Sequence, residues 1–77
     1  MLIDIKDIIT LDDNNEYVVV SKINYNNKTY YQLLEKSKMV ECKFCYEDND
    51  ELVELEDSNL IAYLLPFFME STKEALN

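Results

Sequence analysis

Hydrophobic and polar residues alternate along most of this chain, which is the pattern of β-strands that bury one face. The clearest stretch runs from Glu16 to Glu35, where two apolar and aromatic segments flank the dipeptide Asn26-Asn27. Asn tolerates positive φ angles better than any residue except Gly, so this dipeptide predicts a type I′ turn. We therefore expect one long β-hairpin. The rest of the chain must cover at least one of its faces, because an isolated hairpin is marginally stable in water.

A two-residue loop at this dipeptide fixes the register of the hairpin. It places Tyr25 opposite Lys28. The further pairs it predicts are Ile23 with Tyr30, Lys22 with Tyr31, Ser21 with Gln32, Val20 with Leu33, Val19 with Leu34 and Val18 with Glu35. Aromatic and β-branched residues that face each other stabilise a sheet by roughly 0.2–1 kcal/mol per pair. This register supports the hairpin as the central element of the fold.

Two later segments are expected to add strands to the hairpin. Residues 39–47 alternate regularly, and one set of their side chains is predicted to face the core. That set is Val40, Cys42, Phe44 and Tyr46. A turn at Asp48-Asn49 is expected to lead into a last strand over residues 52–56, which places Phe44 opposite Val53.

The period of the apolar residues changes after Asp57-Ser58-Asn59, whose side chains are typical of a helix N-terminus. The apolar residues then recur on one helical stripe, which consists of Leu60, Ile61, Leu64, Leu65 and Phe68. Pro66 interrupts this segment, and Pro inside a straight helix costs roughly 3 kcal/mol. We expect a kink or break at Pro66, or a second helix that begins there and continues through Glu74.

These elements predict an α+β fold, an antiparallel β-meander of four to five strands with a C-terminal helix packed on one face. The meander is expected over about residues 5–56, with its first strand in residues 5–11, and the helical segment over about residues 58–75. We expect residues 1–77 to form one small acidic domain. A chain of this length buries only about 60% of its unfolded surface, so its stability margin is small.

Acidic residues dominate the charge, with 16 Asp and Glu against 7 Lys, which gives a net charge of −9. This charge opposes binding to nucleic-acid phosphates and anionic membranes and favours basic or neutral partners. The chain has no His, the commonest acid–base group and metal ligand. We therefore expect a non-enzymatic protein with no catalytic residue, no cofactor and no metal. The N-terminus lacks the pattern of a secretory signal, so we expect a cytoplasmic protein.

Cys42 and Cys45 form the one motif-like spacing in the chain. A redox CxxC usually lies at a helix N-terminus, and a zinc site needs further ligands. In a strand, a separation of three residues sends the two side chains to opposite faces. We expect Cys42 to be a small core residue and Cys45 a surface residue.

The segment from Leu60 to Met69 is more apolar than one helix face requires. Tyr63 and Phe67 lie off the predicted stripe, and with Phe68 they form our candidate surface for a protein partner or a second copy. The alternative is a helix buried in a small core, with Phe67 partly exposed. The leading function is thus a protein-interaction module. Two alternatives stay open: an acidic regulator that mimics a polyanion, and a metal or redox role of the Cys pair.

Two stretches carry a resemblance to a known family. ITLDDNNEYVVVSKINYNNKTYYQLLE has an acidic turn, a strand, a hairpin and an apolar pair, and ELVELEDSNLI has a strand and an acidic helix start. The run from Ile9 to Leu64 resembles the YrzB-like domain, a family of small acidic bacterial proteins of unknown function. This chain departs from the family pattern at three places. Asn27 replaces the Gly of the hairpin, the acidic segment around Glu35 to Lys38 is shorter, and the C-terminal helix is apolar and contains Pro66. The resemblance implies no catalytic residue.

Overall fold

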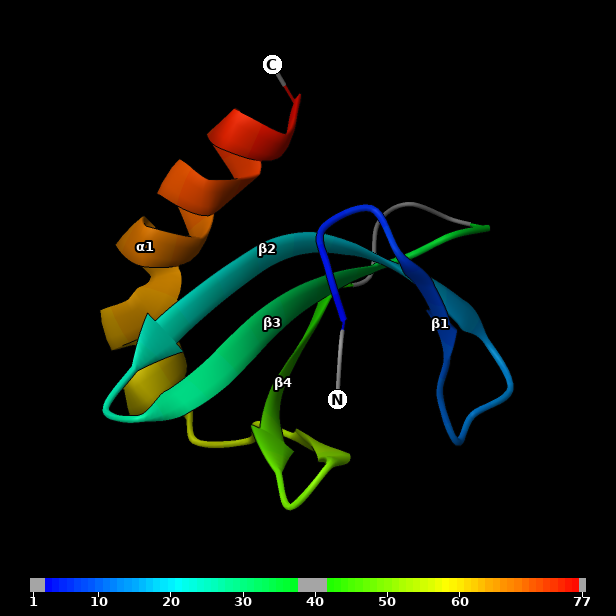
Figure 1. The fold of residues 1–77 in the computed structure, drawn as a ribbon, viewed down its shortest axis with the longest axis horizontal. Coiled ribbons are helices and arrows are strands. Elements are labelled where there is room, and N and C mark those ends of the chain that lie inside the picture. The colour runs from blue at the N-terminus through cyan, green and yellow to red at the C-terminus, as the bar shows by residue number, and fades with distance from the viewer. Residues whose placement is uncertain (1–2, 38–41, 77) are drawn as a thin grey trace.

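The computed structural model describes residues 3–37 and 42–76, and in this part of the chain five strands precede one helix (Figure 1). The elements are β1 (Ile8–Thr10), β2 (Glu16–Tyr25), β3 (Lys28–Glu35), β4 (Cys42–Asp48), β5 (Glu51–Glu54) and α1 (Ser58–Leu76). The sheet has the order β1-β2-β3-β4-β5, and each neighbouring pair is antiparallel. The predicted α+β meander is confirmed.

The turn between β2 and β3 has the predicted left-handed backbone at both central residues. The φ angles of Asn26 and Asn27 are 52° and 66°, as a type I′ turn requires. From this turn, the pairs from Tyr25 with Lys28 to Ser21 with Gln32 follow the predicted register. Asn therefore makes a tight hairpin without Gly.

A β-bulge at Val20 overturns the rest of that register. Beyond it, Val19 lies opposite Leu33 rather than Leu34, and the predicted partners of Val18 and Val20 are also wrong. An extra residue in one strand inverts the alternation of side chains. Val19 therefore joins the core on one face of the sheet, whereas Ser21 contacts the helix on the other face. Strand β2 therefore contributes side chains to the cores on both faces of the sheet.

The turn between β4 and β5 lies at residues 49–50, where φ is 50° and 65°. This is one residue later than predicted, so Tyr46 rather than Phe44 lies opposite Val53. The Leu55 amide donates to the Phe44 carbonyl at 2.7 Å and so extends the same register. Two overlapping Asx dipeptides are available for the turn, and the structure uses the second.

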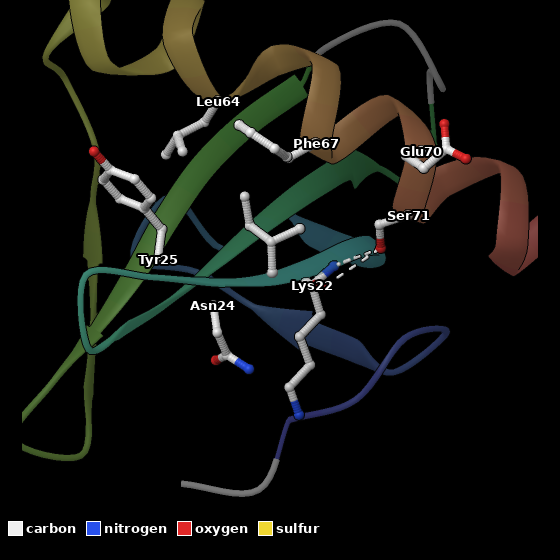
Figure 2. Close-up of a pocket in the computed structure, with 8 residues that line it drawn as sticks. Lys22, Asn24, Tyr25, Leu64, Phe67, Glu70 and Ser71 are labelled. Atoms are coloured by element: carbon white, nitrogen blue, oxygen red, sulfur yellow. Dashed lines mark hydrogen bonds between the residues drawn. The ribbon is translucent and has the colours of Figure 1, made fainter.

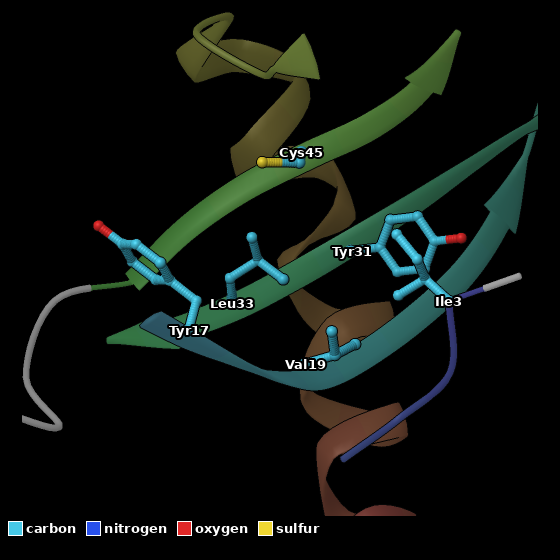
Figure 3. Close-up of a cluster of buried hydrophobic side chains, with 6 residues drawn as sticks. All are labelled: Ile3, Tyr17, Val19, Tyr31, Leu33 and Cys45. Atoms are coloured by element: carbon cyan, nitrogen blue, oxygen red, sulfur yellow. The ribbon is translucent and has the colours of Figure 1, made fainter. Parts of the chain in front are cut away.

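Hydrophobic side chains are buried on both faces of the sheet. The cluster on the face away from α1 consists of Ile3, Tyr17, Val19, Tyr31, Leu33 and Cys45 (Figure 3). The cluster under the helix consists of Tyr30, Leu55, Leu64 and Phe68, with Phe44 and Tyr46 packed against it. A core on each face was not expected from the sequence.

This second core reverses the expected positions of the two cysteines. Cys45 is buried, with 2% of its surface exposed, whereas Cys42 is exposed. The prediction failed because it assigned β4 a single buried face. Of the predicted core set in this strand, Phe44 and Tyr46 do face the helix, and Val40 lies outside the described residues.

Helix α1 begins at the predicted cap and continues past Pro66. The Asp57 Oδ1 atom accepts hydrogen bonds from the amides of Asn59 (3.0 Å) and Leu60 (3.2 Å). The helix is unbroken to Leu76, so a break or a second helix at Pro66 is wrong, and a kink stays a prediction. Pro66 and Ala62 are both exposed. The Ala62 carbonyl that loses its hydrogen bond can therefore bind water.

One face of α1 packs on the sheet and the other faces solvent. Leu64 and Phe68 are buried, and Leu60 and Ile61 are half-buried. Leu65 is exposed, so its predicted place on the stripe is wrong. Within the described residues, no helix is both long enough and apolar enough to cross a membrane.

Candidate functional site

The solvent-facing side of α1 carries several large apolar side chains. Tyr63, Phe67 and Met69 have 56%, 51% and 62% of their surfaces exposed, and Leu65 is also exposed. The Tyr63 ring lies 6.1 Å from the Phe67 ring and 5.6 Å from the Tyr25 ring. We call Tyr25, Tyr63 and Phe67 the aromatic row. It runs from the end of the central hairpin along the helix.

The structure separates the three residues of the predicted partner surface. Tyr63 and Phe67 are exposed, as their positions off the stripe predicted. Phe68 is fully buried, and its ring lies 5.0 Å from the Phe44 ring. Its inclusion in an exposed surface is wrong because Phe68 lies one helical turn after Leu64, on the buried face. Sequence reasoning also missed Tyr25, Leu65 and Met69, which are exposed.

A groove of about 370 Å³ lies between α1 and the end of β2 (Figure 2). The helix contributes Leu64, Phe67, Glu70 and Ser71, and the strand contributes residues 22–25. The side chains of Tyr25, Leu64 and Phe67 lie on the groove side of β2, and those of Lys22 and Asn24 point away from it (Figure 2). The groove is therefore mainly apolar.

Glu70 supplies the negative charge of this groove. The ammonium group of Lys22 is engaged on the other side of β2, where it donates to the Ile3 carbonyl at 2.9 Å and lies 4.0 Å from Asp4. Among the described residues that line the groove, Glu70 is thus the charged side chain that remains near the opening. The site favours neutral or cationic groups.

The end of β2 that borders the groove is an open sheet edge. Strand β1 pairs with residues 16–18, and the segment before it reaches Val19. Further along, the Lys22 amide donates to Ser71 Oγ at 3.1 Å, and this hydroxyl lies 3.4 Å from the Lys22 carbonyl. Ser71 therefore takes the place of a neighbouring strand at Lys22.

Asn24 is the next residue whose backbone groups point outward from this edge. The type I′ turn makes Tyr25 and Lys28 a hydrogen-bonded pair, so the N–H and C=O groups of Asn24 face away from β3. No group in the described part of the chain bonds to them. The sequence held a signal for this edge. If the chain turns at residues 12–15, a first strand that begins at Ile5 can pair with β2 only as far as Ser21, so the rest of β2 has no neighbouring strand on that side.

A buried polar cluster fixes the helix beside this edge. The Phe68 carbonyl oxygen lies 2.8 Å from Ser21 Oγ and 2.9 Å from Thr72 Oγ1, and the two hydroxyls contact each other. The Gln32 side-chain oxygen lies 3.2 Å from Ser21 Oγ. These bonds hold α1 on the sheet at the point where the bulge turns Ser21 towards it. The walls of the groove are therefore positioned before any partner binds.

A second set of polar and charged groups joins the β1–β2 turn to β2 and β4. The Asp13 carboxylate accepts hydrogen bonds from the Asn15 amide (2.9 Å), the Tyr17 hydroxyl (2.7 Å) and the Lys43 ammonium (3.3 Å). The Asn15 amide, followed by the Tyr17 hydroxyl, lowers the pKa of Asp13 from 3.8 to about 2. Every member of this set has a partner, so its role is structural.

This pKa predicts an acid-dependent loss of stability. Because the pKa of Asp13 is lower in the folded state, its contribution is present above pH ~4 and is lost as the pH falls through about 2. The destabilisation caused by Asp13→Asn should be full at pH 7 and should shrink between pH ~4 and ~2. Urea unfolding of parent and variant across this range measures it, with Asp12→Asn as the control from the same turn. A difference that is independent of pH would contradict the assignment.

The two cysteines do not form a joint site. Cys42 is exposed, whereas Cys45 lies in the core on the opposite face of β4. Burial, and secondarily the charge of Glu54, raises the pKa of the Cys45 thiol to about 11. This thiol is therefore protonated at neutral pH. The described residues contain no group of three or more His, Cys, Asp or Glu side chains that could hold a metal ion.

Comparison of the chain with protein-family models, curated proteins and solved structures found no match. The resemblance to the YrzB-like domain stays a prediction from the sequence.

Proposed function

We propose that this protein is a non-enzymatic interaction module that binds another protein through the aromatic row and the adjoining groove. The observation that carries the proposal is the exposure of Tyr63 and Phe67, whose rings lie 6.1 Å apart, on a helix whose other face already fills the core. Contiguous exposed apolar surface on a soluble domain is typical of a binding site. The proposal places this activity in the cytoplasm.

The side chains of the aromatic row have the properties of interface anchors. Tyr and other aromatic residues combine a large apolar area with few rotatable bonds, and they are enriched at energetically important contacts. Tyr63 contacts both Tyr25 and Phe67, so each ring limits the motion of its neighbour. The helix beneath them is anchored by Leu64 and Phe68. Binding therefore requires little reorganisation of the protein.

The test is capture of a partner from nuclease-treated lysate by the tagged protein and by a Tyr63→Ser/Phe67→Ser variant. Both substitutions remove exposed apolar side chains, so the variant should remain folded, which circular dichroism checks. We expect the variant to retain at least tenfold less of a specific partner. Ile8→Ser is the matched control, because Ile8 is also half-exposed but lies on β1, outside the aromatic row and the groove.

Three results would contradict the proposal. The first is equal retention of partners by the parent and the double variant. The second is capture of a DNA-binding protein whose retention is abolished by high salt but is unchanged in the double variant. This result would support the polyanion mimic. The third is a specific complex that forms only between copies of this chain, detected by light scattering, and that the double variant leaves intact.

A further inference from the structure

We propose that the groove between β2 and α1 binds an extended, basic segment of the partner, which adds as a short strand to the open edge at Asn24. This inference rests on the proposed function and specifies the chemistry of the partner. The outward N–H and C=O groups of Asn24 lack a partner among the described residues. An added strand can bond to both groups at once, as in other complexes formed by strand addition.

The pleat of the added strand determines which of its side chains enter the groove. The peptide residue opposite Asn24 directs its side chain to the same face as Asn24, away from α1. The residues before and after it direct theirs to the face of Tyr25, where Leu64 and Phe67 form the opposite wall (Figure 2). The groove therefore suits a segment with apolar residues at alternate positions.

Charge selects a basic segment rather than a second copy of this chain. Glu70 lies at the groove, and the protein carries a net charge of −9. Two copies would bring like charges together, whereas Lys or Arg in the segment would lie near Glu70. Lys22 does not oppose this, because its ammonium group is held on the other side of β2.

Ser71 limits the length of the added strand. Its hydroxyl already bonds to the backbone of Lys22, so the free edge extends from Asn24 towards the turn. Because β2 ends at Tyr25, the bound segment should have only about three residues in contact with the edge. Such a short strand must obtain much of its affinity from the apolar groove.

The experiment is selection of a displayed library of random twelve-residue peptides against the intact protein, followed by synthesis of the selected peptides. We expect peptides with alternate apolar residues and at least one Lys or Arg. If the peptide adds antiparallel to β2, as we propose, the residue opposite Asn24 exchanges both hydrogen bonds with it, so methylation of that one backbone nitrogen should weaken binding at least tenfold. Methylation of the next nitrogen should change it less than threefold, because that group faces solvent. This scan uses the unaltered protein and does not depend on the folding of any variant.

A pair of substitutions at Asn24 provides the complementary test. Asn24→Pro removes the outward N–H but no hydrogen bond to β3, and Pro is tolerated on edge strands. Asn24→Ala keeps the N–H and is the matched control, since both variants lose the exposed bond to Thr29. We expect at least tenfold weaker peptide binding by Asn24→Pro and less than threefold change by Asn24→Ala.

Several outcomes would overturn this inference: selection of no peptide, selection of acidic peptides, or a scan of methylated nitrogens without an alternating effect. If the Tyr63→Ser/Phe67→Ser variant nevertheless loses its partner, the proposed function stands and strand addition alone is rejected. If selected peptides bind with the expected alternation but no partner depends on the aromatic row, the edge is a binding site and the proposed function is rejected.

Discussion

Phe68→Ala is expected to lower the free energy of unfolding by about 3–5 kcal/mol. Phe68 is fully buried between α1 and the sheet, and its ring packs against Phe44 at 5.0 Å. Removal of the ring leaves a cavity, because the strands that surround it also hold the core on the other face and cannot collapse inward freely. A domain of this length has a total stability of about 4–12 kcal/mol. The variant should therefore be close to unfolding.

Phe67→Ala is the matched control for this prediction. It makes the same chemical change at the neighbouring position of the same helix, but about half of the Phe67 side chain is exposed. We expect it to change stability by less than about 1 kcal/mol. Urea denaturation of both variants, followed by circular dichroism, measures the two values. Similar losses for both would show that Phe68 does not anchor the helix.

Ser21→Ala is expected to cost about 1–3 kcal/mol, although it removes a single oxygen atom. Ser21 is fully buried, and its hydroxyl contacts the Phe68 carbonyl, the Thr72 hydroxyl and the Gln32 side chain. Each hydroxyl has one proton, so Ser21 and Thr72 must share the acceptors between them. Loss of Ser21 leaves the oxygen of Gln32 poorly bonded at the interface between helix and sheet.

A double-mutant cycle with Thr72→Val tests this shared bonding. We expect the two substitutions to be non-additive by about 0.5–3 kcal/mol, because each removes a partner of the other. Thr29→Val is the control, since it removes a hydroxyl whose single bond, to Asn24, is exposed. Its effect should lie within about 0.5 kcal/mol. Additive effects of Ser21→Ala and Thr72→Val would show that the two hydroxyls act independently.

The sequence was most informative where structure depends on a few adjacent residues. The turn at Asn26-Asn27 and the cap at Asp57 follow from side-chain chemistry and local backbone preference, and both are confirmed. The strand order also follows from the short connections. The exposure of Tyr63 and Phe67 followed from helical periodicity, because it depends on one helix and the face that it buries.

Features that depend on distant contacts were not predictable in the same way. The bulge at Val20 has no signal in the adjacent residues. It directs side chains of β2 into two cores, so it depends on contacts with distant parts of the chain. The burial of Cys45 depends on a second covered face, which Ile3 helps to cover. The free edge at Asn24 depends on the difference in length between β1 and β2, for which the turn at residues 12–15 held a signal, but its position beside the helix depends on tertiary packing. The candidate groove therefore required the three-dimensional structure, although two of the three residues of the aromatic row, Tyr63 and Phe67, did not.

The turns without Gly also affect the unfolded chain. Residues other than Gly take positive φ at six described positions, which are Lys6, Asn14, Asn26, Asn27, Asn49 and Asp50. A side chain in this backbone conformation adds strain to the native state. The same side chains restrict the backbone when the protein unfolds, so less conformational entropy is lost on folding than a Gly at each site would lose. The strain of the native turns is therefore partly offset by a narrower denatured ensemble.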